Sequence, residues 1–556
     1  MTLFTEISKP IEIGLEKFGY EKKIEVKFSD FNKDYDVQIN NLVSVRKSKD
    51  YDLIVGEVTK ILKNNESIEA YDISENGFVS LRLHESYIKI LLENQFDYFQ
   101  SKIKKNNQTV MFDFGGANIG KSLHVGHIRT LNIGRSLKNI YDFAGYKTIS
   151  DIHYGDWGMP IAQIIAYIEK ESLDFKSLKH GDLEKIYPLA AKLSKEDKEF
   201  YKTALNISKE LNLRKETRIN QWRTIYDIST KNIVSILDDL DFYFDHYLGE
   251  SDVILLIPDF IEFIKKENLA VLDDGALIAN DGQDPPALIT KSDGSYMYLT
   301  TDIGTILYRE KNFKADKYIY VVDERQKNHF NQLFKLVEFF DLSQSEFLHI
   351  GFGTVNDKNG NPLKTRDGEN YKLLQLFTDI QKQLSEINSD EKTVKMLSKS
   401  VLTYSDLVTK RTGNYVFDLE KFTNTSGKSA IFIQYSQVRA KRLLEQSNIN
   451  YQFLTVSGTE RDLLIEIIKF KYYFNLSLNL NEPHHLAEYA YNLCQEFNRF
   501  YTNNKIFDEN INDSLRSHRL FVVSMFYETI IKTFQCLGLQ PVDNMWWFKL
   551  NKKLWR

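Results

Sequence analysis

The chain has 556 residues, of which 42% are hydrophobic and 27% are charged, and its formal net charge is -5. The length suggests about three or four domains, and the ordinary composition excludes a chain that is disordered throughout. Because the net charge is weakly negative, any binding of RNA would depend on local basic patches. Only Cys494 and Cys536 are present, which excludes a four-cysteine zinc site and argues against a disulfide framework.

The first 105 residues mix predicted helices with short strands, including the alternating sequence FVSLRL at 78–83. We interpret residues 1–105 as an appended α+β domain. The N-terminal sequence MTLFTEISKPIEIG lacks the basic start and the continuous apolar stretch of a signal peptide, and no run of about 18 apolar residues follows. We therefore expect a cytoplasmic protein that makes no membrane contact.

Residues 106–385 alternate strand-like runs, such as KYIYVV at 317–322, with amphipathic helices. This alternation predicts an α/β catalytic domain built on a parallel sheet of the Rossmann type. A helical insertion is predicted to interrupt this domain at about 165–250.

Residues 390–556 are predicted to form an all-helical bundle. Apolar residues repeat there at the period of a buried helix face, namely Leu486, Tyr489, Leu493, Phe497 and Phe500. The predicted fold class is therefore α/β, with a small α+β domain before the parallel sheet and a helical domain after it.

The most informative sequence is FDFGGANIGKSLHVGHIR at 112–129. Alternating apolar residues predict a half-buried strand at its start, and apolar residues at helical spacing follow it. Gly115, Gly116 and Gly120 allow close backbone approach, and the N-terminus of the following helix offers free amide hydrogens to phosphate. His124 and His127 share one helix face, and together with Lys121 they suit the negative charge of a phosphoryl transition state.

The His-x-Gly-His element resembles the first signature of class I aminoacyl-tRNA synthetases. The longer sequence NIGKSLHVGHIR at 118–129 is similar to the pattern N-x-A-K-P-L-H-V-G-H-x-R of arginyl-tRNA synthetases. This resemblance implies that ATP, in complex with Mg²⁺, is a substrate, and we expect no protein-bound zinc or other metal. The residues implied to bind ATP are Gly116, Gly126, His124, His127, Lys364 and Thr365.

A second group of residues concerns the amino acid. Tyr298 is predicted to lie just before a helix that begins near Asp302, and an isolated Asp at such a place usually caps the helix. Arginyl-tRNA synthetases have Tyr-x-x-x-Asp before this helix and a Gln in the next strand-to-helix segment, and a guanidinium prefers planar carboxylate acceptors. The residues implied to bind arginine are Asp113, Asn118, His124, Tyr298, Asp302 and Gln326. Many family members have Glu at position 113, so Asp113 reaches about one methylene less far.

A turn-rich loop follows the strand predicted at 347–353. Class I synthetases place a mobile KMSKS loop after the last strand of the sheet, where its lysines neutralise ATP phosphates, and Lys364-Thr365-Arg366 resembles the arginyl version. That version lacks the second lysine, so we expect Lys121 to supply the compensating charge. The catalytic residues implied are Lys121, His124, His127, Lys364 and Arg366.

The helical region resembles the anticodon-binding domain of the family, especially at 431–444 and 486–506. Unpaired bases are read by stacking on aromatic rings and by hydrogen bonds to base edges, although most aromatic residues on such helices belong to the core. The residues expected to contact tRNA there are Gln434, Tyr435, Tyr491, Asn498 and Tyr501. By the same resemblance, the domain at 1–105 contacts the tRNA elbow, with Gln38 and Asn40 as candidates.

The resemblance implies the reaction of the arginyl-tRNA synthetase family. The arginine carboxylate attacks the α-phosphate of ATP, pyrophosphate leaves, and a hydroxyl of the terminal adenosine of tRNA(Arg), the 2′-hydroxyl in class I, takes the arginyl group. We expect a monomer whose activation step depends on tRNA. Two alternatives stay open: a small-molecule nucleotidyltransferase, which would not need the helical domain, and a catalytically silent RNA-binding relative, which would have lost the motif residues.

Overall fold

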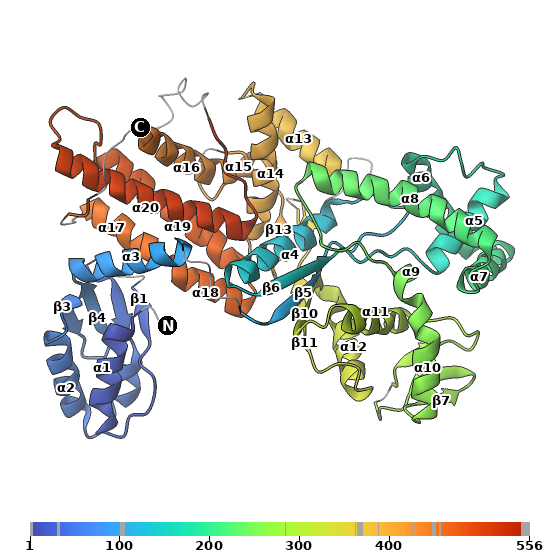
Figure 1. The fold of residues 1–556 in the computed structure, drawn as a ribbon, viewed down its shortest axis with the longest axis horizontal. Coiled ribbons are helices and arrows are strands. Elements are labelled where there is room, and N and C mark those ends of the chain that lie inside the picture. Colours follow the sequence, from blue (N-terminus) through green and yellow to red (C-terminus); the bar gives the residue numbers. More distant parts are fainter. Residues whose placement is uncertain are drawn as a thin grey trace.

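The computed structural model describes residues 4–29, 34–100, 106–283, 285–357, 359–361, 363, 371–386, 388–424, 426–446, 452–454 and 458–545. In Figure 1 the parallel sheet lies at the centre of an elongated molecule, between the helical C-terminal region on one side and a group of insertion helices on the other. The small N-terminal domain lies below the helical region in this view.

The N-terminal domain is built on an antiparallel sheet in the order β1-β2-β4-β3. Its strands are β1 (Val26–Phe28), β2 (Val37–Ile39), β3 (Ile68–Ile73) and β4 (Val79–Leu83), and its helices are α1 (Thr5–Glu16), η1 (Asn41–Val45), α2 (Tyr51–Lys63) and α3 (Glu85–Gln100). Alternate residues of β4 are buried, so the alternating pattern at 78–83 did predict a strand. The domain is joined to the helical region by an ion pair of 2.6 Å between Asp36 and Arg461.

The central sheet has the order β11-β10-β5-β6, and all its strands are parallel. The strands are β5 (Thr109–Asp113), β6 (Lys147–Asp151), β10 (Lys317–Asp323) and β11 (Glu346–Phe352). The expectation that β5 is half-buried was wrong, because Val110, Met111 and Phe112 are all at most 1% exposed. A central strand of a parallel sheet has both faces covered, so its intervening residue Met111 is as buried as its neighbours.

Helices cover the sheet, and the segments that follow the carboxyl ends of its strands form the site. They are α4 (Val125–Phe143), α11 (Tyr298–Asn312), η3 (Glu324–Gln326) and α12 (Lys327–Phe339). The segment before α11 contains α9 (Glu250–Val253), η2 (Ile254–Leu256), α10 (Ile257–Lys266) and a small antiparallel sheet of β7 (Ala270–Asp273), β8 (Ala276–Ala279) and β9 (Leu288–Thr290). The insertion predicted at about 165–250 contains α5 (Met159–Lys170), α6 (His180–Glu196), α7 (Lys198–Asn212) and α8 (Glu216–Asp239).

After the sheet the chain is almost wholly helical. The elements are β12 (Val355–Asn356), α13 (Leu373–Ser385), α14 (Glu391–Leu407), β13 (Tyr415–Val416), α15 (Leu419–Phe422), α16 (Ala430–Glu445), α17 (Gly458–Ile468), α18 (Phe470–Leu480), α19 (His484–Asn503) and α20 (Asp513–Leu537). The predicted apolar stripe of α19 is fully buried, which confirms the helical pattern there. The three-part division of the chain remains our interpretation.

Helix α20 is the one helix, among the residues that the structure describes, that is long and apolar enough to cross a membrane. Its apolar stretch is 67% buried, and it packs against α4, α16, α17 and α19. The apolar composition of α20 is therefore that of a core helix of the bundle.

Candidate active site

The His-x-Gly-His segment forms the N-terminus of α4, directly after the loop that leaves β5. His124 is the N-cap of α4, and its Nδ1 accepts a hydrogen bond of 3.0 Å from the backbone N–H of Gly126. The Nδ1 of His127 accepts a hydrogen bond of 3.0 Å from the backbone N–H of His124. Because a backbone N–H can only donate, these two bonds assign both Nδ1 atoms as acceptors, and each Nε2 remains for a ligand.

The two histidines are neutral donors. Burial lowers the pKa of His124, and the nearby charge of Lys121 lowers it further. Burial and the neighbouring His124 lower the pKa of His127 to about 3. A neutral imidazole whose Nδ1 accepts carries its proton on Nε2, so both rings present an N–H to the site. Such preorganised donors stabilise negative charge that develops on a phosphate.

The glycines and Lys121 shape the approach to these donors. A Cβ atom at Gly126 would lie 2.8 Å from Cε1 of His124, so a side chain there would displace the imidazole. Gly116 is exposed at a φ of +48°, and no heavy atom lies within 4 Å of where its Cβ would be, which leaves its backbone open to a ligand. Lys121 is exposed, with its Nζ 4.2 Å from the centre of the Tyr187 ring. Asn118 is also exposed and pairs as an isolated bridge with Gly155.

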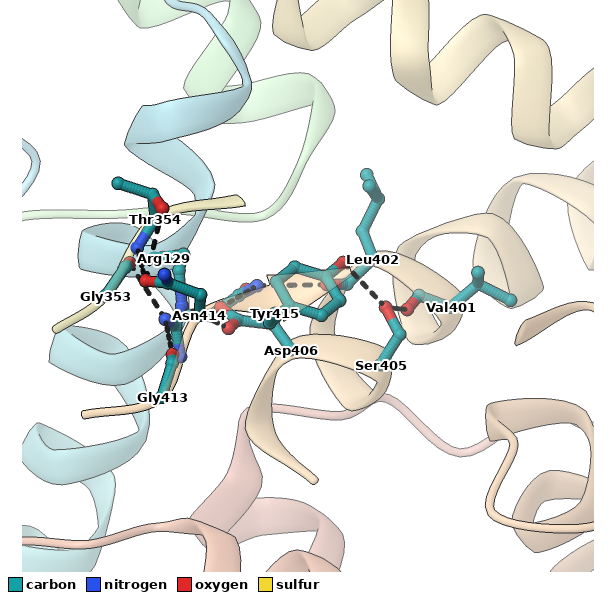
Figure 2. A network of polar contacts seen from close by, with 11 residues as sticks. Arg129, Gly353, Thr354, Val401, Leu402, Ser405, Asp406, Gly413, Asn414 and Tyr415 are labelled. Carbon is teal, nitrogen blue, oxygen red and sulfur yellow. Dashed lines mark hydrogen bonds and ion pairs between the residues drawn. The ribbon is translucent and has the colours of Figure 1, made fainter. Parts of the chain in front are cut away.

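Arg129, the last residue of the segment, is a buried structural residue (Figure 2). Its Nε donates to Asp406 of α14 at 2.9 Å, and its Nη1 donates to the carbonyl oxygens of Gly353 and Gly413, each at 2.8 Å. Gly353 follows β11 and begins the segment that leads to the predicted phosphate-binding loop. Arg129 therefore fixes the base of that loop to the helix that carries the two histidines.

A buried cluster around Asp113 forms what we call the inner end of the site. Nη2 of Arg309 lies 2.7 Å from Asp113 and 2.7 Å from Asp151, at the carboxyl ends of β5 and β6. Burial raises the pKa of Asp113, although Arg309 opposes this. Against the effect of burial, His153 and Arg309 lower the pKa of Asp151 to about 2. Arg309 belongs to this chain, so the carboxylate predicted to bind a guanidinium already has one.

The start of α11 forms what we call the outer end of the site. This helix begins at Tyr298, with Met297 as its N-cap, so the expectation that Asp302 begins or caps the helix was wrong. Asp302 lies one turn into the helix, where its Oδ2 accepts a hydrogen bond of 2.6 Å from Nε2 of His329. Its side chain is 34% exposed, and that of Tyr298 is 70% exposed. A ligand can therefore reach both residues.

The structure adds Glu250, which the sequence analysis did not single out, to the outer end of the site. Glu250 starts α9 and lines a cavity of about 180 Å³ together with Trp157, Tyr298 and Thr301. Burial raises the pKa of Glu250 to about 7, and the charge of His153 partly opposes this. The signal available in the sequence was only a carboxylate after a glycine, which is too common to indicate a site.

The remaining predicted catalytic and amino-acid residues are placed only in part. Gln326 is exposed and is the N-cap of α12, so its side chain is accessible beside the end of β10. Lys364, Thr365 and Arg366 lie outside the described residues. The base of their loop is described, because the backbone N–H of Leu363 donates to the carbonyl of Val355 at 3.1 Å.

The helical region brings three of the residues predicted to contact tRNA together around Arg439. The Arg439 guanidinium lies 4.4 Å from the ring centre of Tyr435 and 4.3 Å from that of Tyr501, and its Nη1 donates to Asn498. This arrangement is a partly exposed aromatic and cationic surface of α16 and α19. Sequence reasoning missed Arg439, whose position four residues after Tyr435 was the available signal.

Gln434 has a different environment, because it is completely buried. Its Nε2 donates to Ser400 at 3.0 Å and to the carbonyl of Gln540 at 2.8 Å, and its Oε1 accepts from the N–H of Val542 at 3.1 Å. An RNA base cannot reach it in this conformation, and we assign it a structural role. Tyr491 of α19 is half-buried. In the N-terminal domain, Gln38 of β2 is partly exposed, and Asn40, directly after β2, is exposed.

Comparison with known proteins identifies the class to which this fold and site belong. A parallel sheet whose first strand leads through a glycine-containing loop to His-x-Gly-His defines a class I aminoacyl-tRNA synthetase. Residues 87–419 match the model of tRNA synthetases class I (R), catalytic domain, and residues 433–545 match the DALR anticodon binding domain.

The particular family follows from the relatives. The arginine–tRNA ligase of Alkaliphilus oremlandii is 30% identical over 98% of this chain and 100% of its own length, and that of Agathobacter rectalis is 29% identical with the same coverage. Two solved structures share the fold. The arginyl-tRNA synthetase of Plasmodium falciparum has a TM-score of 0.80 and 23% identity, over 97% of this chain and 99% of that chain. The arginyl-tRNA synthetase of Thermus thermophilus has a TM-score of 0.79 and 18% identity, over 98% of this chain and 100% of that chain. The chain belongs to the arginine–tRNA ligase family.

Proposed function

We propose that this chain is an arginine–tRNA ligase, which activates L-arginine with ATP and transfers it to the terminal adenosine of tRNA(Arg). The observation that carries the chemistry is the pair of neutral imidazoles at the start of α4, held by two backbone hydrogen bonds. The observation that supports the amino acid is an accessible Asp302 whose charge acts on Glu250, while Glu250 and Tyr298 line one cavity.

The activation step needs charge stabilisation more than acid or base chemistry. When the arginine carboxylate attacks the α-phosphate, negative charge grows on the phosphate oxygens, and His124 and His127 donate to it from Nε2. The neutral state of both rings keeps them as donors without proton transfer. Lys121, Lys364 and Arg366 supply positive charge to the phosphates, and Thr365 and the backbone at Gly116 contribute further contacts. ATP enters as its complex with Mg²⁺, which is part of the substrate.

Arginine selection depends on the two ends of the acidic site. Asp302 accepts the substrate guanidinium, Tyr298 adds its hydroxyl, and Glu250 contributes a second carboxylate from the facing segment. Asp113 contributes a smaller share because it is already bound to Arg309. Asn118 and Gln326, both exposed beside the ends of β5 and β10, hold the main-chain groups of the amino acid.

The RNA partner is tRNA(Arg). The surface of Tyr435, Arg439, Asn498 and Tyr501 combines rings with a cation and an amide, which suits stacking with unpaired bases, and Tyr491 lies on the same helix as Tyr501. Gln38 and Asn40 would meet the tRNA elbow. We propose further that the protein acts in the cytoplasm as a monomer.

The test is aminoacylation of bulk tRNA with arginine, lysine, citrulline and glutamine offered separately. We expect arginine alone to become attached, with AMP and pyrophosphate as products, and pyrophosphate exchange to require tRNA. Attachment of another amino acid would contradict the proposal. Adenylylation of a small molecule without any tRNA product would instead favour a nucleotidyltransferase, and no turnover at all would favour a silent RNA-binding protein.

A further inference from the structure

The turn between α18 and α19 brings together a glutamate and two histidines, far along the chain from the proposed catalytic residues. Glu482 is 9% exposed, and the side chains of His484 and His485 are 11% and 20% exposed. One potential ligand atom from each residue lies within 4.8 Å of those of the other two. This cluster is not used by the proposed reaction.

The two distances from the carboxylate of Glu482 are close to those between neighbouring ligands of a tetrahedral ion. Oε2 of Glu482 lies 3.6 Å from Nδ1 of His484 and 3.4 Å from Nε2 of His485. Metal–ligand bonds of about 2.0–2.1 Å at tetrahedral angles place neighbouring ligand atoms about 3.3 Å apart. The same separations are long for direct hydrogen bonds.

The two imidazole nitrogens are buried without a hydrogen-bond partner. Nδ1 of His484 and Nε2 of His485 are both inaccessible to solvent, and neither has a partner among the described residues. Buried polar atoms normally have partners, so two orphan nitrogens beside one carboxylate oxygen indicate a missing ligand.

The surrounding charges leave room for a cation. Lys410 lies 3.9 Å from Oε1 of Glu482, the oxygen that does not face the histidines, and 61% of its side chain is exposed. Glu488, on the next turn of α19, is paired with Lys428 at 2.7 Å. Arg411 is directed elsewhere, since it donates to the carbonyls of Asn481 and Gly351.

We propose that Glu482, His484 and His485 bind one divalent transition-metal ion, with Zn²⁺ the best match to two imidazoles and a carboxylate. The fourth position is open to water. The site is independent of the ligase activity, and it differs from our sequence-based expectation of no protein-bound zinc or other metal. A Glu-x-His-His sequence at a helix start was the available signal.

The site has a structural role at the junction of the helical region with the sheet. The preceding residue, Asn481, adopts a left-handed conformation with φ of 52°. Its carbonyl accepts from Arg411, whose Nη1 holds Gly351 at the end of β11, and its side chain accepts from Tyr141 of α4. An ion bound beside Asn481 would stabilise the turn that makes all these contacts.

The test is titration of the metal-free full-length protein with Zn²⁺ by calorimetry, and with Co²⁺ by visible absorption. We expect one high-affinity ion per chain, a tetrahedral Co²⁺ spectrum and a rise of several degrees in the melting temperature with Zn²⁺. Glu482→Gln should weaken binding at least tenfold and abolish the rise, while Glu488→Gln, which removes a nearby carboxylate of α19 that is not a proposed ligand, should bind as the wild type does.

His485→Gln gives a second removal of a ligand in case Glu482→Gln does not fold, and melting in EDTA establishes whether each variant is folded. Equal Zn²⁺ affinity of Glu482→Gln, His485→Gln and the wild type would overturn the proposal, because the ion would then bind to other histidines. The absence of a one-to-one site in the wild type would overturn it as well.

Discussion

The inner and outer ends of the acidic site hold their carboxylates in different ways. At the inner end, Asp113 and Asp151 share the completely buried Arg309. At the outer end, Asp302 is one-third exposed and is bound by His329, a residue that can lose its charge. The inner carboxylates are therefore neutralised permanently by the chain itself, whereas the outer one can exchange its partner for a substrate guanidinium.

This difference separates a structural role from a recognition role for residues of the same type. A buried ion pair with good geometry fixes the ends of β5 and β6, and breaking it is costly because an uncompensated charge remains. A partly exposed pair contributes little to stability. Replacing the cation at each end, Arg309 or His329, tests this difference directly.

The largest effect is expected at the inner end, from Arg309→Met. The substitution keeps much of the side-chain volume but leaves two buried carboxylates without their cation, so it should lower the free energy of unfolding by about 3–5 kcal/mol. Chemical denaturation at neutral pH measures this. The matched change at the outer end, His329→Gln, should cost no more than about 1 kcal/mol. Similar losses in the two variants would remove the distinction between the two ends.

Asp302→Asn tests recognition at the outer end. Loss of a charge-assisted bond of about 1.5–3 kcal/mol should raise the KM for arginine by about 10–100-fold, with a smaller change in kcat. Asp113→Asn should raise this KM less, because Arg309 already occupies that carboxylate. Steady-state aminoacylation of tRNA(Arg) measures both. A larger KM effect at Asp113 would reverse our assignment of the two carboxylates.

Lys121→Ala sharpens the comparison by changing a cation on the phosphate side, away from both carboxylates. If Lys121 compensates for the missing second lysine of the loop, its removal should lower kcat for arginine activation about tenfold and leave arginine binding nearly unchanged. Pyrophosphate exchange in the presence of tRNA separates the two quantities. Lys121→Arg, which keeps the charge, serves as the control. An unchanged kcat in Lys121→Ala would show that Lys121 supplies no such charge.

The smallest effect is a pH dependence at the outer end. The hydrogen bond to Asp302 raises the pKa of His329, so below that pKa the charged imidazole competes with arginine, and above it Asp302 is released. The KM for arginine should therefore fall several-fold as pH rises through this pKa. Glu250, with a pKa of about 7, becomes negatively charged as the pH rises, which should also lower the KM for arginine. The pH profile of Glu250→Gln separates this contribution from that of His329. His329→Gln should flatten part of the profile; an unaltered profile would exclude the competition.

The sequence predicted the placement of a side chain best where that side chain is held by nearby backbone groups. Spacing within His-Val-Gly-His is sufficient to place both imidazoles at a helix start, because each Nδ1 is held by a local amide. The parallel sheet and the helical region were also predictable from periodicity alone. Motif matching selected Tyr298 and Asp302 as candidates, which stays a prediction, and the helix starts four residues earlier than expected.

The sequence could not predict contacts that depend on distant elements. Nothing near Asp113 indicates that Arg309, almost 200 positions later, will neutralise it, and Glu250 reaches the pocket only through the fold of the inserted segment. Gln434 illustrates the same limit, since an amide on an aromatic-rich helix suits RNA and core equally, and contacts with Gln540 and Val542 decide between them. Burial is a property of the packed chain.

The most direct test of the account is the selectivity for arginine over its neutral analogue citrulline, measured as the ratio of the two kcat/KM values for pyrophosphate exchange with tRNA(Arg) present. If Asp302 recognises the guanidinium by its charge, the wild type should strongly prefer arginine, and Asp302→Asn should reduce the ratio at least tenfold. An equal ratio in the two proteins would contradict the account, because arginine would then be selected elsewhere in the pocket.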